Sequence, residues 1–252
     1  MSAKTERPQC FIRNSGFLVS KCLDKLSYSN LQRTMELLRL SPYGLKSLAA
    51  KDGEELPPGI FAYGGPWKYL TFLNLVVQFI FFGLAALNDL QPGDQSESTL
   101  NKCKDFLFTV FVVPVGMFVV LLFWTIFAYD RELIYPATID TFFHPWMNHA
   151  MHTLVLPFLL GEVLVQPHVY PQTKHALAAL GVVGLAYLFW ILWVYLSVGL
   201  WVYPLLRHFS TSCLVGFFFL NMSMVTLFYL LGKSLNSLVW RKGMSKVAAK
   251  TK

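Results

Sequence analysis

Five long stretches of the chain consist almost entirely of apolar residues. They cover residues 69–88, 106–129, 145–165, 177–198 and 213–231. Each stretch is close to the roughly 20 residues that a helix needs to cross the hydrocarbon core of a bilayer. The pattern predicts five transmembrane helices, and the short polar connections predict that consecutive spans are antiparallel neighbours. Pro114 lies inside the second stretch and predicts a kink in that helix.

The amino-acid composition favours the same fold class. Hydrophobic residues make up 55% of the chain and charged residues 14%, whereas a soluble domain has about 25% charged residues. So few charges could not cover a water-exposed surface. We therefore expect an all-α fold, a polytopic bundle of transmembrane helices with five visible spans. Its expected parts are a basic, non-spanning segment (1–60), the helical bundle (61–240) and a basic tail (241–252).

The basic residues gather mainly at the two ends of the chain, which has a net charge of +7. This distribution is typical of the cytoplasmic flanks of membrane spans, so we expect contact with the lipid bilayer and not with nucleic acid. The tail after the fifth stretch holds six basic residues and no acid. It should be cytoplasmic, in the plasma membrane or an endomembrane. The four cysteines have no metal-ligand spacing.

The segment before the first stretch conflicts with this orientation. Its first 51 residues hold nine basic residues and should also prefer the cytoplasm, yet five spans place the two ends on opposite sides. A sixth crossing would resolve the conflict, but no stretch before Trp67 is long and apolar enough. Leu31, Met35 and Leu38 share one helical face and indicate either an interfacial helix or disorder. Residues 50–66 have the composition of a linker.

The third stretch is unusual because it carries several polar side chains. Asn148, His149, His152 and Glu162 all fall within it. His149 and His152 are three residues apart and so neighbour each other on one helix face, and Asn148 precedes His152 by four residues. Polar groups are costly inside a membrane, so the cluster predicts either a functional site or hydrogen bonds that hold neighbouring helices together.

A metal site is one interpretation of the cluster. His144, His149 and His152, together with Glu162 or Asp140, could supply ligands for zinc or iron. The chain has six histidines and no repeated HxxHH boxes, which excludes the eight-histidine di-iron lipid oxidases. A single zinc held by three histidines stays open.

A nucleophile and its base are the other interpretation, which needs no metal or cofactor. Such a pair requires a hydroxyl or thiol within hydrogen-bond reach of a histidine. The first and third stretches start on the same side of the membrane. His152 is then about 10 Å deep at 1.5 Å per residue, and Thr71 and His152 lie in the same half of the bilayer. Asn74 could orient a substrate carbonyl. A threonine near a helix start also commonly bonds to its own backbone.

Several sequence runs resemble the androgen-induced protein family, which includes the androgen-dependent tissue-factor-pathway-inhibitor-regulating protein. The runs are GGPWKYLTFLNLVVQFIFFG, VVPVGMFVV, FWTIFAYDRELIYP, PWMNHAMHTLVLPF and GLWVYPLLRHF, and the resemblance covers residues 62–240. It implies a six-span membrane protein that hydrolyses fatty acid esters of hydroxy fatty acids with an intramembrane threonine and a histidine. In this chain the threonine and the histidine of the family fall on Thr71 and His152. Family members have an apolar span before the GG-x-WK run, where this chain has its basic, polar segment.

The mechanism that the resemblance implies is acyl transfer to Thr71, with His152 as general base, followed by hydrolysis. The alternatives that stay open are a zinc-dependent intramembrane lipid hydrolase and a non-catalytic membrane scaffold or regulator. The candidates for binding the substrate or its oxyanion are Asn74, Asn148, His149 and Tyr135. The candidates for orienting His152 are Asp130, Asp140 and Glu162.

Overall fold

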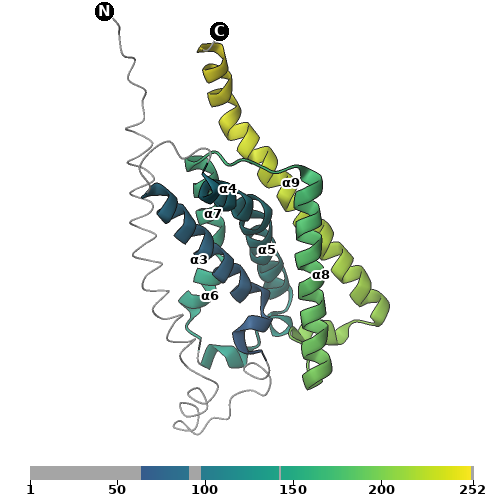
Figure 1. The fold of residues 1–252 in the computed structure, drawn as a ribbon. Coiled ribbons are helices and arrows are strands. Elements are labelled where there is room, and N and C mark those ends of the chain that lie inside the picture. The colour runs from purple at the N-terminus through teal and green to yellow at the C-terminus, as the bar shows by residue number, and fades with distance from the viewer. Residues whose placement is uncertain (1–63, 91–97, 142, 251–252) are drawn as a thin grey trace, which may run out of the picture. The chain divides into compact units, whose positions relative to one another are not determined.

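The computed structural model of the chain describes residues 64–90, 98–141 and 143–250 (Figure 1). Within these ranges the chain is helical. The helices are α3 (Leu70–Asp89), α4 (Thr99–Leu107), α5 (Val113–Tyr129), α6 (Pro145–His152), α7 (Val155–Val165), α8 (Thr173–Val198) and α9 (Thr211–Lys250). Short helical turns are η1 (Gly65–Lys68), η2 (Phe108–Val112), η3 (Arg131–Leu133), η4 (Ala137–Thr141) and η5 (Pro204–His208). The predicted basic segment 1–60 and its amphipathic face lie outside the described residues.

Five helical spans in the described part of the chain are long and apolar enough to cross a membrane. They are Leu70–Asp89, Thr99–Tyr129, Pro145–Val165, Thr173–Val198 and Thr211–Trp240. The predicted all-α transmembrane bundle with five visible spans is confirmed. Some predicted boundaries were wrong, because polar turns extend the apolar helices. The second span begins at Thr99 and not at residue 106, and α9 continues through the basic residues of the tail to Lys250.

The second span contains a π-helical turn, η2, immediately before Pro114. The N–H of Val113 donates to the carbonyl of Phe108, five residues earlier. Pro114 has no N–H for the carbonyl four residues before it, and an inserted π turn is one way in which a helix accommodates that loss. The kink predicted from Pro114 stays a prediction, and the structure shows a π-helical turn at this place.

The third span is divided into α6 and α7, which corrects the prediction of one uninterrupted helix. The N–H groups of Thr153 and Leu154 both donate to the carbonyl of His149, at 2.8 and 3.0 Å. Pro157 explains the break, because its ring conflicts with the carbonyl four residues earlier, that of Thr153, and it has no N–H to donate there. The break leaves His152 as the last residue of α6.

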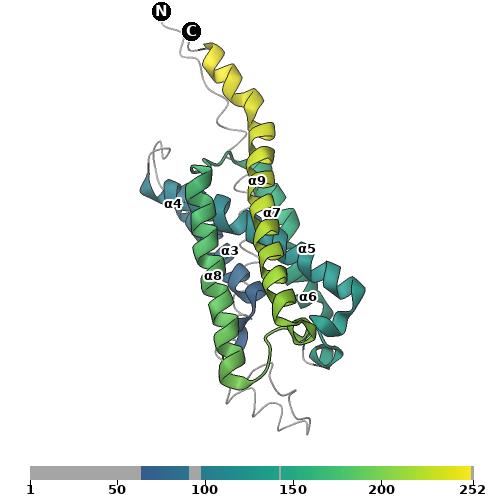
Figure 2. The ribbon, with the colours of Figure 1, turned by 90° about the vertical axis from the view of Figure 1, so that its right-hand side faces the viewer.

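Helix α5 is the centre of the bundle and contacts α3, α6, α7 and α9 (Figures 1 and 2). Helix α7 packs against α5 and α9, whereas α8 packs against α9 and η2. In the described part of the chain the third and fourth spans thus do not pack extensively against each other, which departs from the prediction that all consecutive spans are neighbours. The outer faces of α8 and α9 expose large apolar side chains, including Phe189, Leu196 and Phe219, as expected of surfaces in contact with lipid.

A buried polar cluster around His168 joins the helices at the end of the bundle opposite to the start of α3. The Nδ1 atom of His168 lies 2.9 Å from Oδ1 of Asp105, and its Nε2 atom lies 3.4 Å from Oε1 of Glu162. Phe108 stacks on the imidazole, with centroids 4.1 Å apart. The backbone of His168 also exchanges two hydrogen bonds with the side chain of Asn236. The cluster therefore fixes the segment between α7 and α8 to α4 and α9.

The charges around His168 determine its protonation. Burial by itself lowers the pKa of His168, but the hydrogen bonds and negative charges of Asp105 and Glu162 outweigh it and raise the pKa above the ordinary value. A protonated imidazole between two carboxylates is the arrangement that these contacts favour.

Gly232 allows α9 to lie close to α5. A Cβ atom at this position would be 2.8 Å from Cγ1 of Val113 and 3.0 Å from the hydroxyl of Tyr170, whereas a Cβ atom at Gly216 of the same helix would meet nothing within 4 Å. We expect Gly232→Val to lower the free energy of unfolding by about 1–3 kcal/mol through overpacking, and Gly216→Val to have little effect. Thermal unfolding of the purified variants in detergent measures this difference. Equal stability of the two variants would contradict the close approach.

Candidate active site

Thr71 and His152 lie within hydrogen-bond distance of each other. Thr71 is in the first turn of α3 and His152 is the last residue of α6, and the Oγ1 atom of Thr71 is 3.2 Å from Nε2 of His152. The two residues are 81 positions apart in the sequence, so tertiary packing of α3 against α6 brings them together.

Asn148 determines which nitrogen of His152 carries the hydrogen. The Nδ1 atom lies 2.8 Å from the side-chain Oδ1 of Asn148 and 3.1 Å from its backbone carbonyl oxygen. A backbone carbonyl only accepts hydrogen bonds, so Nδ1 is the donor. In the neutral imidazole Nε2 then has no hydrogen and accepts the hydroxyl hydrogen of Thr71. This is the orientation that a histidine needs to act as a base toward a hydroxyl.

Two aromatic residues of α5 fix the position of His152. The ring of Phe123 is nearly parallel to the imidazole, with centroids 3.5 Å apart and an interplanar angle of 9°. The indole N–H of Trp124 donates to the backbone carbonyl of His152 at 2.9 Å. That bond satisfies one of the carbonyls that the end of α6 leaves without a helical partner. The imidazole of His152 is thus packed on one face against Phe123, and the backbone of His152 is held by a hydrogen bond.

Two tyrosines anchor the first turn of α3, where Thr71 is located. The N–H of Leu70 donates to the hydroxyl of Tyr203 at 2.9 Å, that hydroxyl lies 2.9 Å from the hydroxyl of Tyr187, and Tyr187 donates to the carbonyl of Lys68 at 3.1 Å. The hydroxyl hydrogen of Tyr187 is donated to the carbonyl of Lys68, so between the two tyrosines the hydroxyl of Tyr203 is the donor. Burial raises the pKa of Tyr203 above its ordinary value, so its hydroxyl stays protonated. The chain of hydroxyls links α3 to α8 and to η5.

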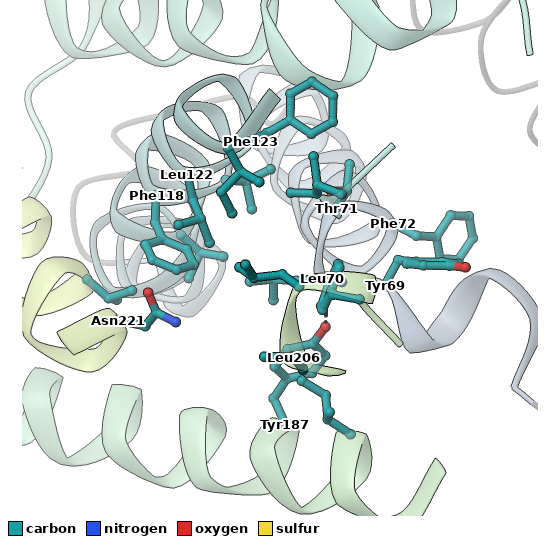
Figure 3. Close-up of a pocket in the computed structure, with 18 of the residues that line it drawn as sticks. Tyr69, Leu70, Thr71, Phe72, Phe118, Leu122, Phe123, Tyr187, Leu206 and Asn221 are labelled. Atoms are coloured by element: carbon teal, nitrogen blue, oxygen red, sulfur yellow. Dashed lines mark hydrogen bonds between the residues drawn. The ribbon is translucent and has the colours of Figure 1, made fainter. Parts of the chain in front are cut away.

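Thr71 and His152 face a cavity of about 350 Å³ (Figure 3). Its wall is formed by α3, α5, α6, α8, α9, η5 and the loop between α5 and α6, and it is almost entirely apolar. Phe118, Leu122 and Leu206 are among its lining residues. A cavity of this size and character fits the hydrocarbon chain of a lipid better than a polar metabolite.

The other predicted site residues are in different environments. Asn148 bonds to His152 and so orients the histidine. His149 is on the exposed side of α6, where it bonds to the hydroxyl of Thr153 at 3.1 Å and stacks on Trp124. Asn74 is 2% exposed, and neither polar atom of its side chain has a hydrogen-bond partner among the residues that the structure describes. It does not line the cavity.

Tyr135, in the loop between α5 and α6, does line the cavity. It is 6% exposed, and its buried hydroxyl has no hydrogen-bond partner in the described part of the chain. Burial, together with the nearby charge of Asp140, raises the pKa of Tyr135 to about 12. The hydroxyl is therefore protonated at neutral pH.

The acids that were candidates for orienting His152 have other partners. Asp130 accepts a hydrogen bond from the N–H of Glu132, Asp140 pairs with Arg131 at 2.6 Å, and Glu162 lies beside His168. Among the described residues, histidine, cysteine and acidic side chains do not form a group of three that could hold a metal ion. The predicted zinc ligands are thus not brought together.

Sequence reasoning missed the orienting role of Asn148 and the contribution of Phe123. The four-residue spacing of Asn148 and His152 was a usable signal, because it places the two side chains on one face of a helix. Phe123 gave no such signal, since aromatic residues are frequent throughout the second span.

The model of the FAR-17a/AIG1-like protein family matches residues 35–237 of the chain. The chain belongs to the FAR-17a/AIG1-like family. This confirms the resemblance found in the sequence runs, and the match begins upstream of residue 62, where that resemblance starts. The structure itself matches no solved structure.

Three named relatives are similar to this protein over most of its chain. The human androgen-induced gene 1 protein is 40% identical over 207 residues, which cover 77% of this chain and 87% of that protein. The human androgen-dependent TFPI-regulating protein is 43% identical over 190 residues, covering 74% and 83%. Its counterpart from Mesocricetus auratus is 40% identical over 208 residues, covering 81% and 89%.

Proposed function

We propose that this member of the family is a lipid esterase that hydrolyses fatty acid esters of hydroxy fatty acids within the membrane. Thr71 is the nucleophile and His152 the general base. The observation that carries the proposal is the contact between Oγ1 of Thr71 and Nε2 of His152 at the wall of an apolar cavity. The sequence runs around these two residues, GGPWKYLTF and NHAMHT, support the substrate class.

The reaction proceeds in two half-reactions. The hydroxyl oxygen of Thr71 attacks the ester carbonyl carbon while Nε2 of His152 takes its proton. The tetrahedral intermediate then collapses, and the leaving alkoxide takes that proton and departs as the hydroxy fatty acid. In the second half-reaction His152 removes a proton from water, the hydroxide attacks the acyl group on Thr71, and the fatty acid is released with the proton returned to Thr71.

The oxyanion needs hydrogen-bond donors at the cavity wall. In a helix that begins at Leu70, the N–H groups of Thr71 and Phe72 have no acceptor within the helix, and both residues line the cavity. We assign these two N–H groups, together with the hydroxyl of Tyr135, as the donors. Asn148 is a positioning residue, because its two oxygens hold Nδ1 of His152.

The orientation proposed from the charge pattern places the C-terminal tail in the cytoplasm. Helix α9 leads into that tail, and Thr71 is near the end of the bundle at which α9 begins (Figure 1). The Thr71–His152 pair then lies in the half of the bilayer away from the cytoplasm.

A covalent probe tests the assignment of the nucleophile. We expect an alkyl fluorophosphonate to label the full-length protein, purified in detergent, at Thr71, because the probe phosphorus takes the place of the ester carbonyl beside an activated hydroxyl. Mass spectrometry of the labelled peptides locates the adduct, and His152→Ala should lose the labelling. Prior incubation with a fatty acid ester of a hydroxy fatty acid should reduce it.

The alternative functions predict other results when labelling, hydrolysis and lipid binding are measured with the same purified protein. Labelling at another residue, with ester hydrolysis intact, would contradict Thr71 as the nucleophile. Hydrolysis that is lost with a chelator and restored by zinc would indicate a metal-dependent hydrolase. Lipid binding without hydrolysis or labelling would indicate a membrane scaffold or regulator.

A further inference from the structure

One polar side chain of the cavity wall takes no part in the proposed reaction. Asn221 comes from α9 and lines the cavity. It lies about 15 Å along α9 from Thr211, at 1.5 Å per residue. Thr71, by contrast, is in the first turn of α3, which begins at the same end of the bundle (Figure 1). Asn221 is therefore on a different helix from Thr71 and His152, which lie on α3 and α6.

The surroundings of Asn221 are apolar. Its amide extends from α9 toward the centre of the cavity beside Phe118 (Figure 3). The carbonyl oxygen of this amide is buried and has no hydrogen-bond partner among the described residues. A buried polar atom without a partner costs about 1–3 kcal/mol. The amide nitrogen points toward the cavity and the oxygen toward Phe118 (Figure 3). A rotation of the Asn221 amide that lets a molecule in the cavity donate a hydrogen bond to this oxygen would remove that cost.

The chemistry of the wall limits what such a molecule can be. No lysine or arginine is among the residues that line the cavity. A carboxylate placed beside Asn221 would be buried without a counter-ion, which is very unfavourable. A hydroxyl group is neutral, donates to the amide oxygen and accepts from the amide nitrogen. It is therefore the group that matches Asn221.

We propose that Asn221 determines substrate specificity by hydrogen-bonding a hydroxyl group on the lipid chain that enters the cavity, remote from the ester being cleaved. The preferred substrates are then esters whose long chain carries such a hydroxyl. This inference rests on the proposed esterase function, since it places the ester at Thr71 and the chain along the apolar wall toward Asn221.

The test compares two esters that differ only in a hydroxyl near the middle of the acyl chain. With the full-length protein in liposomes, we expect kcat/KM to be about tenfold higher for the hydroxylated ester, the effect of one well-formed hydrogen bond. In Asn221→Leu the ratio of the two kcat/KM values should fall to about one. The control is Ser223→Ala, because Ser223 bonds to the carbonyl of Phe219 in its own helix and does not line the cavity.

A ratio near one in the native protein, or a ratio that Asn221→Leu leaves unchanged, would overturn the role of Asn221. If the native protein cleaves neither ester, the proposed esterase function fails. A binding measurement then tests separately whether Asn221 recognises a hydroxyl group. The displacement of a bound fluorescent fatty acid by hydroxylated and plain fatty acids then gives the ratio of their affinities, which measures the hydroxyl preference without catalysis. Loss of the hydroxyl preference in Asn221→Leu, but not in Ser223→Ala, supports the proposal in that case as well.

Discussion

Replacing Thr71 by alanine is expected to lower kcat for ester hydrolysis by about a thousandfold or more, because the variant has no nucleophile for acyl transfer. His152→Ala should cause a loss of about 10²–10⁴-fold, since the hydroxyl of Thr71 then has no base. The two changes act on one unit, so the double variant should lose little more than the more severe single variant. Hydrolysis is measured with purified protein in liposomes, against native protein prepared in the same way.

Thr153 offers a matched control for the loss of a hydroxyl. It follows His152 directly, its hydroxyl bonds to His149, and it is not part of the cavity wall. Thr153→Ala should therefore keep the native rate, and Thr71→Ser, which retains a hydroxyl, should keep part of it. Full activity in both Thr71→Ala and His152→Ala would reject the mechanism.

The largest effect on stability is expected at Asp105. Its side chain is 6% exposed and accepts hydrogen bonds from His168 at 2.9 Å and from the N–H of Val169 at 3.2 Å. Removing one partner of a buried ion pair costs about 3–5 kcal/mol, so Asp105→Asn should lower the free energy of unfolding by that amount at pH 6. Asp140→Asn breaks the exposed pair with Arg131 and should cost at most about 1 kcal/mol. Unfolding in mixed micelles, followed by circular dichroism, distinguishes the two variants.

The same pair predicts how stability depends on pH. The folded protein raises the pKa of His168 above its ordinary value of about 6.5. Protonation of His168 therefore contributes stability that is fully present below about pH 6.5 and is lost as the pH rises through the higher pKa of the folded state. The difference between the native protein and Asp105→Asn should accordingly be larger at pH 6 than at pH 8.5. A difference independent of pH would mean that His168 is neutral in the folded protein.

Several features of this protein follow from its sequence without tertiary information. The five spans could be located because crossing a bilayer requires about 20 apolar residues in succession, which is a local property. Pro114 marks the position of the π turn in the second span, although a kink and not this turn was predicted. Pro157 contained the information for the break after His152, although the break was not predicted. The shared depth of Thr71 and His152 also followed from counting residues along two helices.

Other features depended on how the helices are rotated and packed against one another. Asn148 was one of four candidates for binding the substrate or its oxyanion, but its side chain lies beside Nδ1 of His152. The role of His168 could not be read from a polar connection between two spans, because its partners lie on α4, α7 and α9.

Apolar length and charge thus determined that this chain is a helical membrane protein and where most of its spans lie. Only the tertiary structure decided which polar groups meet. Within a bilayer any rotation of a helix about its axis leaves an apolar surface facing lipid, so hydrophobicity alone does not fix the rotation. Packing fixes it, and it places Thr71 against His152 and turns Asn221 toward the cavity.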